Sequence, residues 1–252
     1  MYKIPANTLF MGKNLVFVPE CPSTNTLALQ ISQQSPVREG TLVITDHQSA
    51  GKGQQGNIWE AEPRKNLTFS LILKPNFLAV NRQFFLNMVV CLALKDYLME
   101  KTSDVIYIKW PNDILVHGKK ISGILIENQL QGAAIQNSVT GVGFNLNQTR
   151  FNSPSAISLS AITGKKYALE KELPLIIEFI ESRYLQLRQG QYDALLTQYL
   201  ERLYRRHEKH TFSSNDSVFE GVIEDLDEAG RLRIRTEKGV RAFGVKEIGY
   251  VG

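Results

Sequence analysis

Cysteine is scarce in this chain, long apolar runs are missing, and charges of one sign do not gather in blocks. The two cysteines among 252 residues, Cys21 and Cys91, provide neither a disulfide framework nor the paired spacing of a zinc site. The longest apolar run, residues 88–94, is far too short to cross a bilayer, and the first residues lack the pattern of an export signal. We therefore expect a cytoplasmic protein with reduced thiols and no membrane association.

The composition that remains is typical of a packed globular protein. Hydrophobic residues make up 43% of the 252 positions, which suffices for one sizeable domain and a second, small one. The 29 basic and 25 acidic residues are interleaved and leave a net charge of +4. Because a mildly basic surface suits anionic substrates as well as nucleic acid, charge alone leaves both classes of ligand open.

Apolar periodicity predicts a mixed α and β chain that ends in strands. Helices are expected after Asn25 and over residues 81–101, 171–189 and 191–208. Strands are expected over residues 14–18, 41–45, 66–73, 133–148, 218–226, 231–236 and 239–245. Residues 150–164, rich in Ser, Asn, Pro and Ala, are expected to form a surface connection. We interpret the basic run 202–210 as a solvated helix end rather than a phosphate site.

The stretch 105–127, VIYIKWPNDILVHGKKISGILIE, places polar residues at breaks between apolar strands. Pro111 removes a backbone donor and interrupts the first strand, which leaves Asn112 and Asp113 at its edge. A glycine turn and two lysines follow, the second of which is Lys120. Carboxylate, amide and ammonium groups facing one another could hold Mg²⁺ and neutralise a phosphate. The same residues would equally suit a plain β-meander with solvated turns.

A polar triplet, Ser23, Thr24 and Asn25, precedes a run with helical spacing. Such residues are ordinary helix caps, and capping alone would explain them. The two roles are compatible, because hydroxyl and amide groups at a helix start also offer donors and acceptors to a small polar ligand.

A glycine-rich loop follows the strand expected over residues 41–45. Gly51, Gly53 and Gly56 satisfy the dinucleotide-binding pattern G-x-G-x-x-G, but no helix opens on the third glycine and another strand comes next. A protein-kinase loop would have that shape, yet its H-R-D and D-F-G motifs are missing from the sequence. We therefore expect a mobile polar loop that closes over a ligand and carries one large aromatic residue, Trp59.

The motifs KWPND and GKKISGIL, with their order and spacing, resemble the central signature of the biotin protein ligases, also called biotin–[acetyl-CoA-carboxylase] ligases. The resemblance implies an α+β fold, namely a catalytic domain like those of class II aminoacyl-tRNA synthetases and biotin/lipoate ligases, with a mixed sheet and flanking helices. It also implies a small C-terminal SH3-like barrel, and we place the two domains at residues 1–210 and 211–252. The segment before Asn14 is too short for the helix-turn-helix domain of some family members, so we expect the monofunctional type.

The resemblance also assigns roles to residues. It implies a biotin site formed by Ser23, Thr24, Asn25, Gln48, Gly51, Lys52, Gly53, Gln54, Lys120 and Gly141. It implies a nucleotide site formed by Trp59, Lys109, Asn112, Asp113 and Asn145. Asp113 would hold Mg²⁺, and Lys120, assisted by Lys52, would supply the catalytic positive charge.

The glycine loop departs from the family pattern G-R-G-R-x-G-R-x-W. Lys52, Gln54 and Asn57 stand where the family has arginines. Lysine keeps the charge but lacks the fork with which arginine grips a phosphate, and glutamine and asparagine are neutral. Lys52 is therefore retained as a cation, Gln54 only as a polar contact, and Asn57 is left out.

The activity implied is ATP-dependent formation of biotinyl-AMP and transfer of biotin to one lysine of a biotin carboxyl carrier domain. Two other classes stay open. A lipoate or octanoate ligase has the same architecture, but a fatty chain would leave the polar triplet and Gln48 unpaired. A nucleic-acid-binding regulator is weakly supported, because no recognition helix or row of aromatic residues among basic ones is present. We expect a monomer or weak homodimer that does not bind DNA sequence-specifically.

Overall fold

The computed structural model describes residues 2–34, 36–132, 134–214 and 217–251. In the described residues the helices are α1 (Thr24–Gln34), α2 (Phe84–Met99), α3 (Leu159–Thr163), α4 (Leu169–Arg188) and α5 (Tyr192–Glu201), with short 3₁₀ turns η1 (Gln54–Gly56) and η2 (Val80–Arg82). The strands are β1 (Leu15–Cys21), β2 (Thr41–Gln48), β3 (Leu67–Leu73), β4 (Ile106–Lys109), β5 (Asp113–Val116), β6 (Lys119–Gln131), β7 (Ala134–Phe144), β8 (Lys209–Ser214), β9 (Ser217–Leu226), β10 (Leu232–Thr236), β11 (Gly239–Phe243) and β12 (Ile248–Val251).

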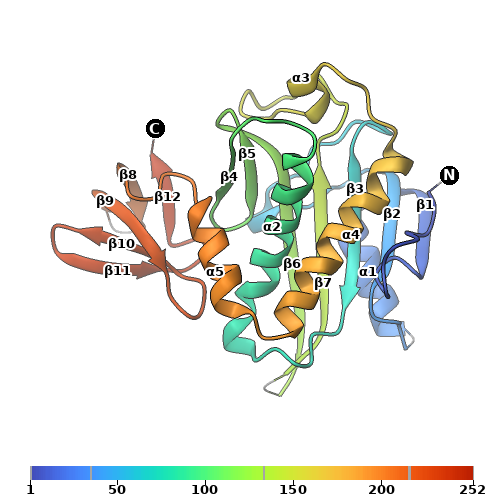
Figure 1. Cartoon of the computed structure of the whole chain (residues 1–252), viewed down its shortest axis with the longest axis horizontal. Helices are drawn as coiled ribbons and strands as arrows, with labels where there is room; N and C mark the ends of the chain where they lie inside the picture. The colour runs from blue at the N-terminus through green and yellow to red at the C-terminus, as the bar shows by residue number, and fades with distance from the viewer. Residues whose placement is uncertain (1, 35, 133, 215–216, 252) are drawn as a thin grey trace.

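These strands form two sheets, a large one in the order β1-β2-β3-β7-β6-β5-β4 and a small one in the order β11-β10-β9-β8-β12 (Figure 1). In the large sheet β1 and β2 are parallel and the other neighbours are antiparallel, whereas every pair in the small sheet is antiparallel. The predicted α+β fold with a mixed sheet and an all-β C-terminal part is therefore confirmed.

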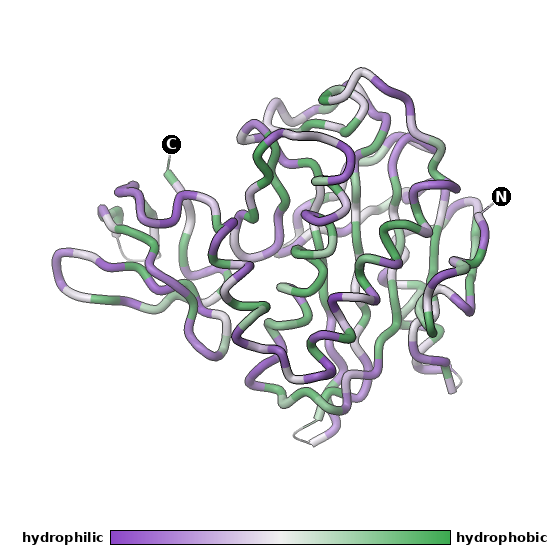
Figure 2. The backbone as a smooth tube through the Cα atoms, in the orientation of Figure 1, coloured by the Kyte–Doolittle hydropathy of each residue, from purple (hydrophilic) through white to green (hydrophobic). Residues whose placement is uncertain are grey.

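Helices cover the two faces of the large sheet unequally. Helices α2, α4 and α5 lie on one face and α1 on the other (Figure 1). Helix α2 is apolar nearly all round (Figure 2), and it is buried between the sheet and the helices α4 and α5. Most of the core lies on this side, while only a small cluster of Ala28, Val37, Val43, Ile72 and Val139 packs under α1. The α1 face thus has room for a ligand.

The segment before β1 contains neither helix nor strand in its described residues 2–14. It is fixed to α4 by the buried carboxylate of Glu181, which accepts hydrogen bonds from the backbone N–H groups of Leu9, Phe10 and Met11 at 2.5, 2.8 and 2.8 Å. A charged acceptor thereby satisfies three backbone donors that would otherwise lie unpaired near the core.

The prediction of one helix over residues 191–208 is wrong beyond Glu201, where α5 ends. The following chain pairs with both sheets instead. The N–H of Ile108 donates to Arg202 O at 2.7 Å, the N–H of Tyr204 donates to Ile108 O at 2.9 Å, and the N–H of His207 donates to Ile223 O at 3.0 Å. Tertiary backbone pairing outweighs local helix propensity here, so this basic segment joins the two sheets and is not a helix end.

Other boundaries also differ from the predictions. Strand β1 continues through Pro19 to Cys21, which a sheet edge tolerates because proline there need not donate to a neighbour. Strand β2 is longer than expected, and β6 continues past the stretch 105–127 to Gln131. The short helix α3 lies inside the expected surface connection, and β8 and β12 were not predicted. The predicted strand over residues 133–148 begins at Ala133, which lies outside the described residues, and β7 ends at Phe144.

In the part of the chain that the structure describes, no helix combines the length and apolar character needed to cross a membrane.

Candidate functional site

A strip without side chains lies on the α1 face of the large sheet. Gly123 of β6 pairs with Gly143 of β7, and Gly141, two residues earlier on β7, pairs with Ser70 of β3. A Cβ at Gly141 would overlap the Asn25 amide, and one at Gly143 would overlap the Trp59 indole. These glycines form the floor of a pocket, because only bare backbone lets other groups approach so closely.

Polar groups close one end of this floor. Ser23, Thr24 and Asn25, at the start of α1, have side chains that are nearly fully buried. Gln48 Oε1, at the end of β2, accepts from the backbone N–H of Thr24 at 2.8 Å and from its hydroxyl at 3.1 Å. Ser70 Oγ lies 2.7 Å from Asn25 Oδ1 and 2.8 Å from Thr24 Oγ1. Thr24, Asn25 and Gln48 thus form one hydrogen-bonded cluster with Ser70, and Ser23 lines the pocket beside it.

A cation lies at the other end. Lys120 Nζ is 2.7 Å from Asp113 Oδ1 and 5.5 Å from the centre of the Trp59 ring. The two residues belong to adjacent strands, β5 and β6, whose hairpin turns at His117 and Gly118 with positive φ. A bulge between Ile114 and Leu115 shifts the register of this pair, and such bulges re-aim side chains. The lysine therefore points over Gly123 toward the floor.

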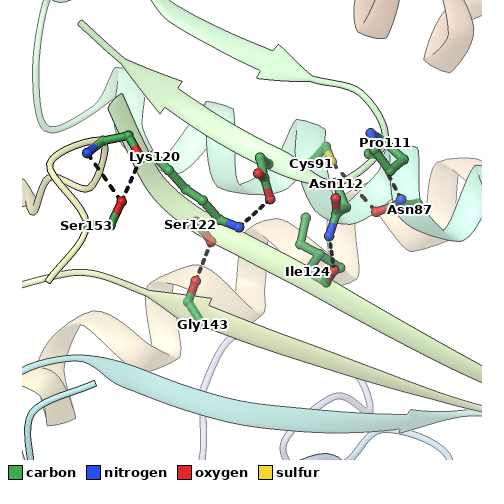
Figure 3. A network of polar contacts seen from close by, with 11 residues as sticks. Asn87, Cys91, Pro111, Asn112, Lys120, Ser122, Ile124, Gly143 and Ser153 are labelled. Atoms are coloured by element: carbon green, nitrogen blue, oxygen red, sulfur yellow. Dashed lines mark hydrogen bonds and ion pairs between the residues drawn. The ribbon is translucent and has the colours of Figure 1, made fainter. Parts of the chain in front are cut away.

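The strand break before Asp113 is held rigidly. Asn112 Nδ2 donates to Ile124 O at 2.5 Å, and Pro111 O accepts from Asn87 Nδ2 at 2.9 Å (Figure 3). The hydroxyl of Tyr199 also donates to Pro111 O, at 3.2 Å. Because side chains of both α2 and α5 hydrogen-bond to Pro111, the Asp113 carboxylate that follows has a fixed position.

The glycine loop folds back as a small hairpin over the floor. The N–H of Trp59 donates to Gly51 O at 3.0 Å, Lys52 bridges to Ile58, and the N–H of Gly53 donates to Asn57 O at 2.7 Å. This pairing lays the Trp59 indole on Gly143. The buried indole Nε1 has no hydrogen-bond partner in the described residues. A polar ligand atom would satisfy it.

These elements bound a pocket whose cavity volume is about 40 Å³. Its lining includes most of the predicted biotin and nucleotide residues, namely Ser23, Thr24, Asn25, Gln48, Lys52, Gly53, Gln54, Trp59, Asn112, Lys120 and Gly141. Four predicted residues do not line it. Gly51 anchors the base of the loop, and Asp113 reaches the pocket through Lys120.

Lys109 and Asn145 are the other two predicted site residues that do not line the pocket. Lys109 lies with Asp113 and Lys120 in an adjoining hollow beside the C-terminal sheet, where its Nζ is 4.9 Å from the Tyr250 ring centre. Asn145 donates from Nδ2 to Ile157 O at 3.2 Å, and its buried Oδ1 has no partner in the described residues.

The sequence reasoning assigned no role to two glycines of the pocket floor or to the serine behind its polar end. Gly123 and Gly143 line the floor, and Ser70 links Thr24 to Asn25. A serine at the centre of the mostly apolar strand LTFSLIL was the one sequence signal for Ser70.

The two cysteines do not contribute a reactive thiolate. Burial raises the pKa of both the Cys21 and the Cys91 thiols above their ordinary value. A raised pKa keeps a thiol protonated and unreactive at neutral pH, so the chemistry of this site rests on hydrogen bonding and on positive charge.

The donor set fits Mg²⁺ only when it arrives with a phosphorylated ligand. Asp113 is the one carboxylate beside the Lys120 ammonium, and no group of three His, Cys, Asp or Glu residues that could hold a metal occurs among the described residues. Mg²⁺ commonly binds one or two carboxylates plus substrate phosphates and waters. Asp113 could therefore take a single place in such a shell.

A substitution at the floor tests this geometry. In Gly143→Ala the new methyl group would overlap the Trp59 indole, so we expect Trp59 to move into solvent and its fluorescence to shift to the red while the melting temperature changes little. The other tryptophan, Trp110, is buried and donates to Gly230 O at 2.9 Å. Its fluorescence should not change, so Gly143→Ala on a Trp59→Phe background should leave the emission spectrum as it is in Trp59→Phe alone. An unaltered spectrum in the single variant would contradict the described position of Trp59.

Two family models, several relatives and solved structures match this chain. The model of the biotin/lipoate A/B protein ligase family matches residues 17–145, and that of the biotin protein ligase C-terminal domain matches residues 211–252. The biotin–[acetyl-CoA-carboxylase] ligase of Paracoccus denitrificans is 28% identical over 239 residues, which cover 91% of this chain and 98% of that protein. The bifunctional ligase/repressor BirA of Bacillus subtilis is 32% identical over 182 residues, or 70% of this chain, and the match spans only 55% of its own length.

Among solved structures, biotin protein ligase from Aquifex aeolicus in complex with biotin and ATP superposes with a TM-score of 0.78 at 25% identity, covering 94% of this chain and 98% of that one. The match of the family model to residues 17–145 takes in the helix start, the glycine loop and the glycine floor. The chain therefore belongs to the biotin/lipoate A/B protein ligase family.

Proposed function

We propose that this protein is a biotin protein ligase that uses ATP to convert biotin to biotinyl-5′-AMP and then attaches biotin to a lysine of a biotin carboxyl carrier domain. One observation carries the proposal: a buried polar cluster and a held lysine lie at opposite ends of a floor of bare backbone. Biotin has matching ends, since its ureido ring both donates and accepts hydrogen bonds and its other end is a carboxylate.

In the first step a carboxylate oxygen of biotin attacks the α-phosphorus of ATP, and the bond to the β-phosphate breaks to release pyrophosphate. Negative charge gathers on the α-phosphate, and Lys120 is placed to stabilise it from a fixed position. Lys52, on the loop above the pocket, adds a second positive charge. The polar cluster holds the ureido ring, so the carboxylate is presented to the nucleotide in one orientation.

In the second step the amine of the carrier lysine attacks the carbonyl carbon of biotinyl-AMP. An amide bond forms, the carbonyl–phosphate bond breaks, and the amine loses a proton as AMP leaves. Charge returns to the same phosphate, so Lys120 serves this step too. The Trp59 loop excludes water from the reactive anhydride by lying over the pocket.

The nucleotide is proposed to extend from the pocket toward Trp59, Asn112 and Asn145 and toward the hollow that holds Lys109. Trp59 Nε1 and Asn145 Oδ1, which have no hydrogen-bond partner among the residues that the structure describes, support this placement. Mg²⁺ held by Asp113 would withdraw charge from the triphosphate. The domain boundary at residue 210, the cytoplasmic location, the monomer or weak homodimer, and the absence of sequence-specific DNA binding remain predictions.

The family also includes lipoate ligases, and ligand binding separates the two specificities. Biotin should raise the melting temperature, because a ligand that binds only the folded state stabilises it by about 2.7 kcal/mol at a hundred times its Kd. Octanoate and lipoate should not, since a fatty chain would cover the pocket-facing polar atoms that the internal hydrogen bonds of the cluster leave over, and would offer them no partner, at a cost of about 1 to 3 kcal/mol per group. Thermal unfolding with each acid reports this directly. Equal protection by octanoate would overturn the assignment of biotin.

Removal of the proposed cation should impair the chemistry more than the fold. Lys120→Met should slow adenylate formation by roughly 10² to 10³, the effect of losing a donor to developing charge. The neighbouring Lys119→Met is a matched control, because Lys119 is exposed and does not line the pocket. Biotin-dependent pyrophosphate release and the melting temperature should be measured for both. Pyrophosphate release by Lys120→Met at the rate of Lys119→Met would reduce Lys120 to a structural residue.

A further inference from the structure

The Asn25 amide at the polar end of the pocket has different neighbours at its two ends. Its Nδ2 donates to Leu125 O at 3.1 Å and to Glu127 Oε2 at 2.8 Å. Its Oδ1 accepts from Ser70 Oγ at 2.7 Å. The backbone carbonyl and the ionised carboxylate are acceptors only, whereas a hydroxyl can donate. These neighbours therefore fix which end of the amide is the nitrogen.

Glu127 is not among the residues that line the pocket, so its influence passes through Asn25. It lies on β6 two residues beyond Leu125, on the same side of the strand, and contacts Asn25 at the start of α1. If the amide turned over, Oδ1 would face both the Leu125 carbonyl and the Glu127 carboxylate. The charged acceptor makes this reversed orientation much less favourable than a neutral one would.

The orientation decides what the pocket offers to a ligand. Asn25 Oδ1 lies over the bare backbone of Gly141, close enough that a Cβ there would overlap it. A ligand on this floor thus meets an oxygen that accepts, and must bring an N–H or O–H donor. A reversed amide would offer its NH₂ group instead and would select for an acceptor.

We propose that Glu127 is a positioning residue that holds the Asn25 amide with its oxygen toward the pocket and thereby makes the site selective for a ligand with a donor, such as a ureido N–H. The identity of this ligand as biotin rests on the proposed function, whereas the orientation of the amide does not.

The test compares two substitutions of Glu127. Glu127→Leu removes the acceptor, so Kd and KM for biotin should rise about tenfold, the effect of one hydrogen bond to a charged group, while KM for ATP and kcat at saturating biotin change less than twofold. Glu127→Gln keeps an oxygen that can accept from Asn25 and should restore most of the affinity. Gln129→Ala is the matched control, because Gln129 lies on the same side of β6 and bonds Asn137 rather than Asn25.

A double-mutant cycle separates positioning from a general loss of structure. On an Asn25→Ala background, Glu127→Leu should change the Kd for biotin less than twofold. If it weakens binding as much with Asn25 absent as with Asn25 present, or if Glu127→Leu binds biotin like the parent, the proposal is wrong.

Nuclear magnetic resonance of the free protein gives a readout that does not depend on biotin. The Asn25 side-chain NH₂ signal should be protected from solvent exchange in the parent and lose protection in Glu127→Leu. A parent protein with a protected amide that fails to bind biotin would contradict the proposed function alone. An amide that exchanges freely in the parent would contradict the positioning role alone.

Discussion

The pocket depends on a narrow strip of sheet that has no side chains. The opposite face of β6 and β7 carries Ile124, Val142 and Phe144, which are buried against the α2 side. Because side chains alternate along a strand, this burial fixes the register and forces the glycines toward α1. A shift of one residue would put bulky side chains into the pocket. The apolar core thus sets the shape of the polar site.

The two ends of the pocket obtain their precision from different sources. At the polar end, elements distant in sequence are held together by hydrogen bonds among buried groups, which are costly to break because an unpaired buried polar atom has no water to replace its partner. At the cationic end, Lys120 and Asp113 come from one hairpin, and the preceding break is gripped by two helices. The segment that follows α5 pairs with β4 and β9, which keeps the C-terminal sheet beside this hairpin.

The sequence predicted best those parts of the site that are local. The triplet belongs to one helix start, and Asp113 and Lys120 belong to one hairpin, so their spacing in the sequence carries the geometry. Contacts between distant elements have no comparable signal in the amino-acid sequence. Ser70 meets Asn25 across 45 positions and Glu127 meets it across 102, and neither belongs to a recognisable motif. The helix predicted through Glu208 shows the same limit, since its end is set by backbone pairing with Ile108.

The central claim, biotin transfer by an acyl-adenylate route, is tested most directly by the mass of the acceptor. The protein should be incubated with biotin, ATP, Mg²⁺ and a biotin carboxyl carrier domain, and the carrier then analysed by intact mass spectrometry. The account predicts a single addition equal to biotin minus one water, on one lysine, that requires both biotin and ATP. A carrier of unchanged mass, or one that gains an octanoyl or lipoyl group when those acids replace biotin, would contradict it.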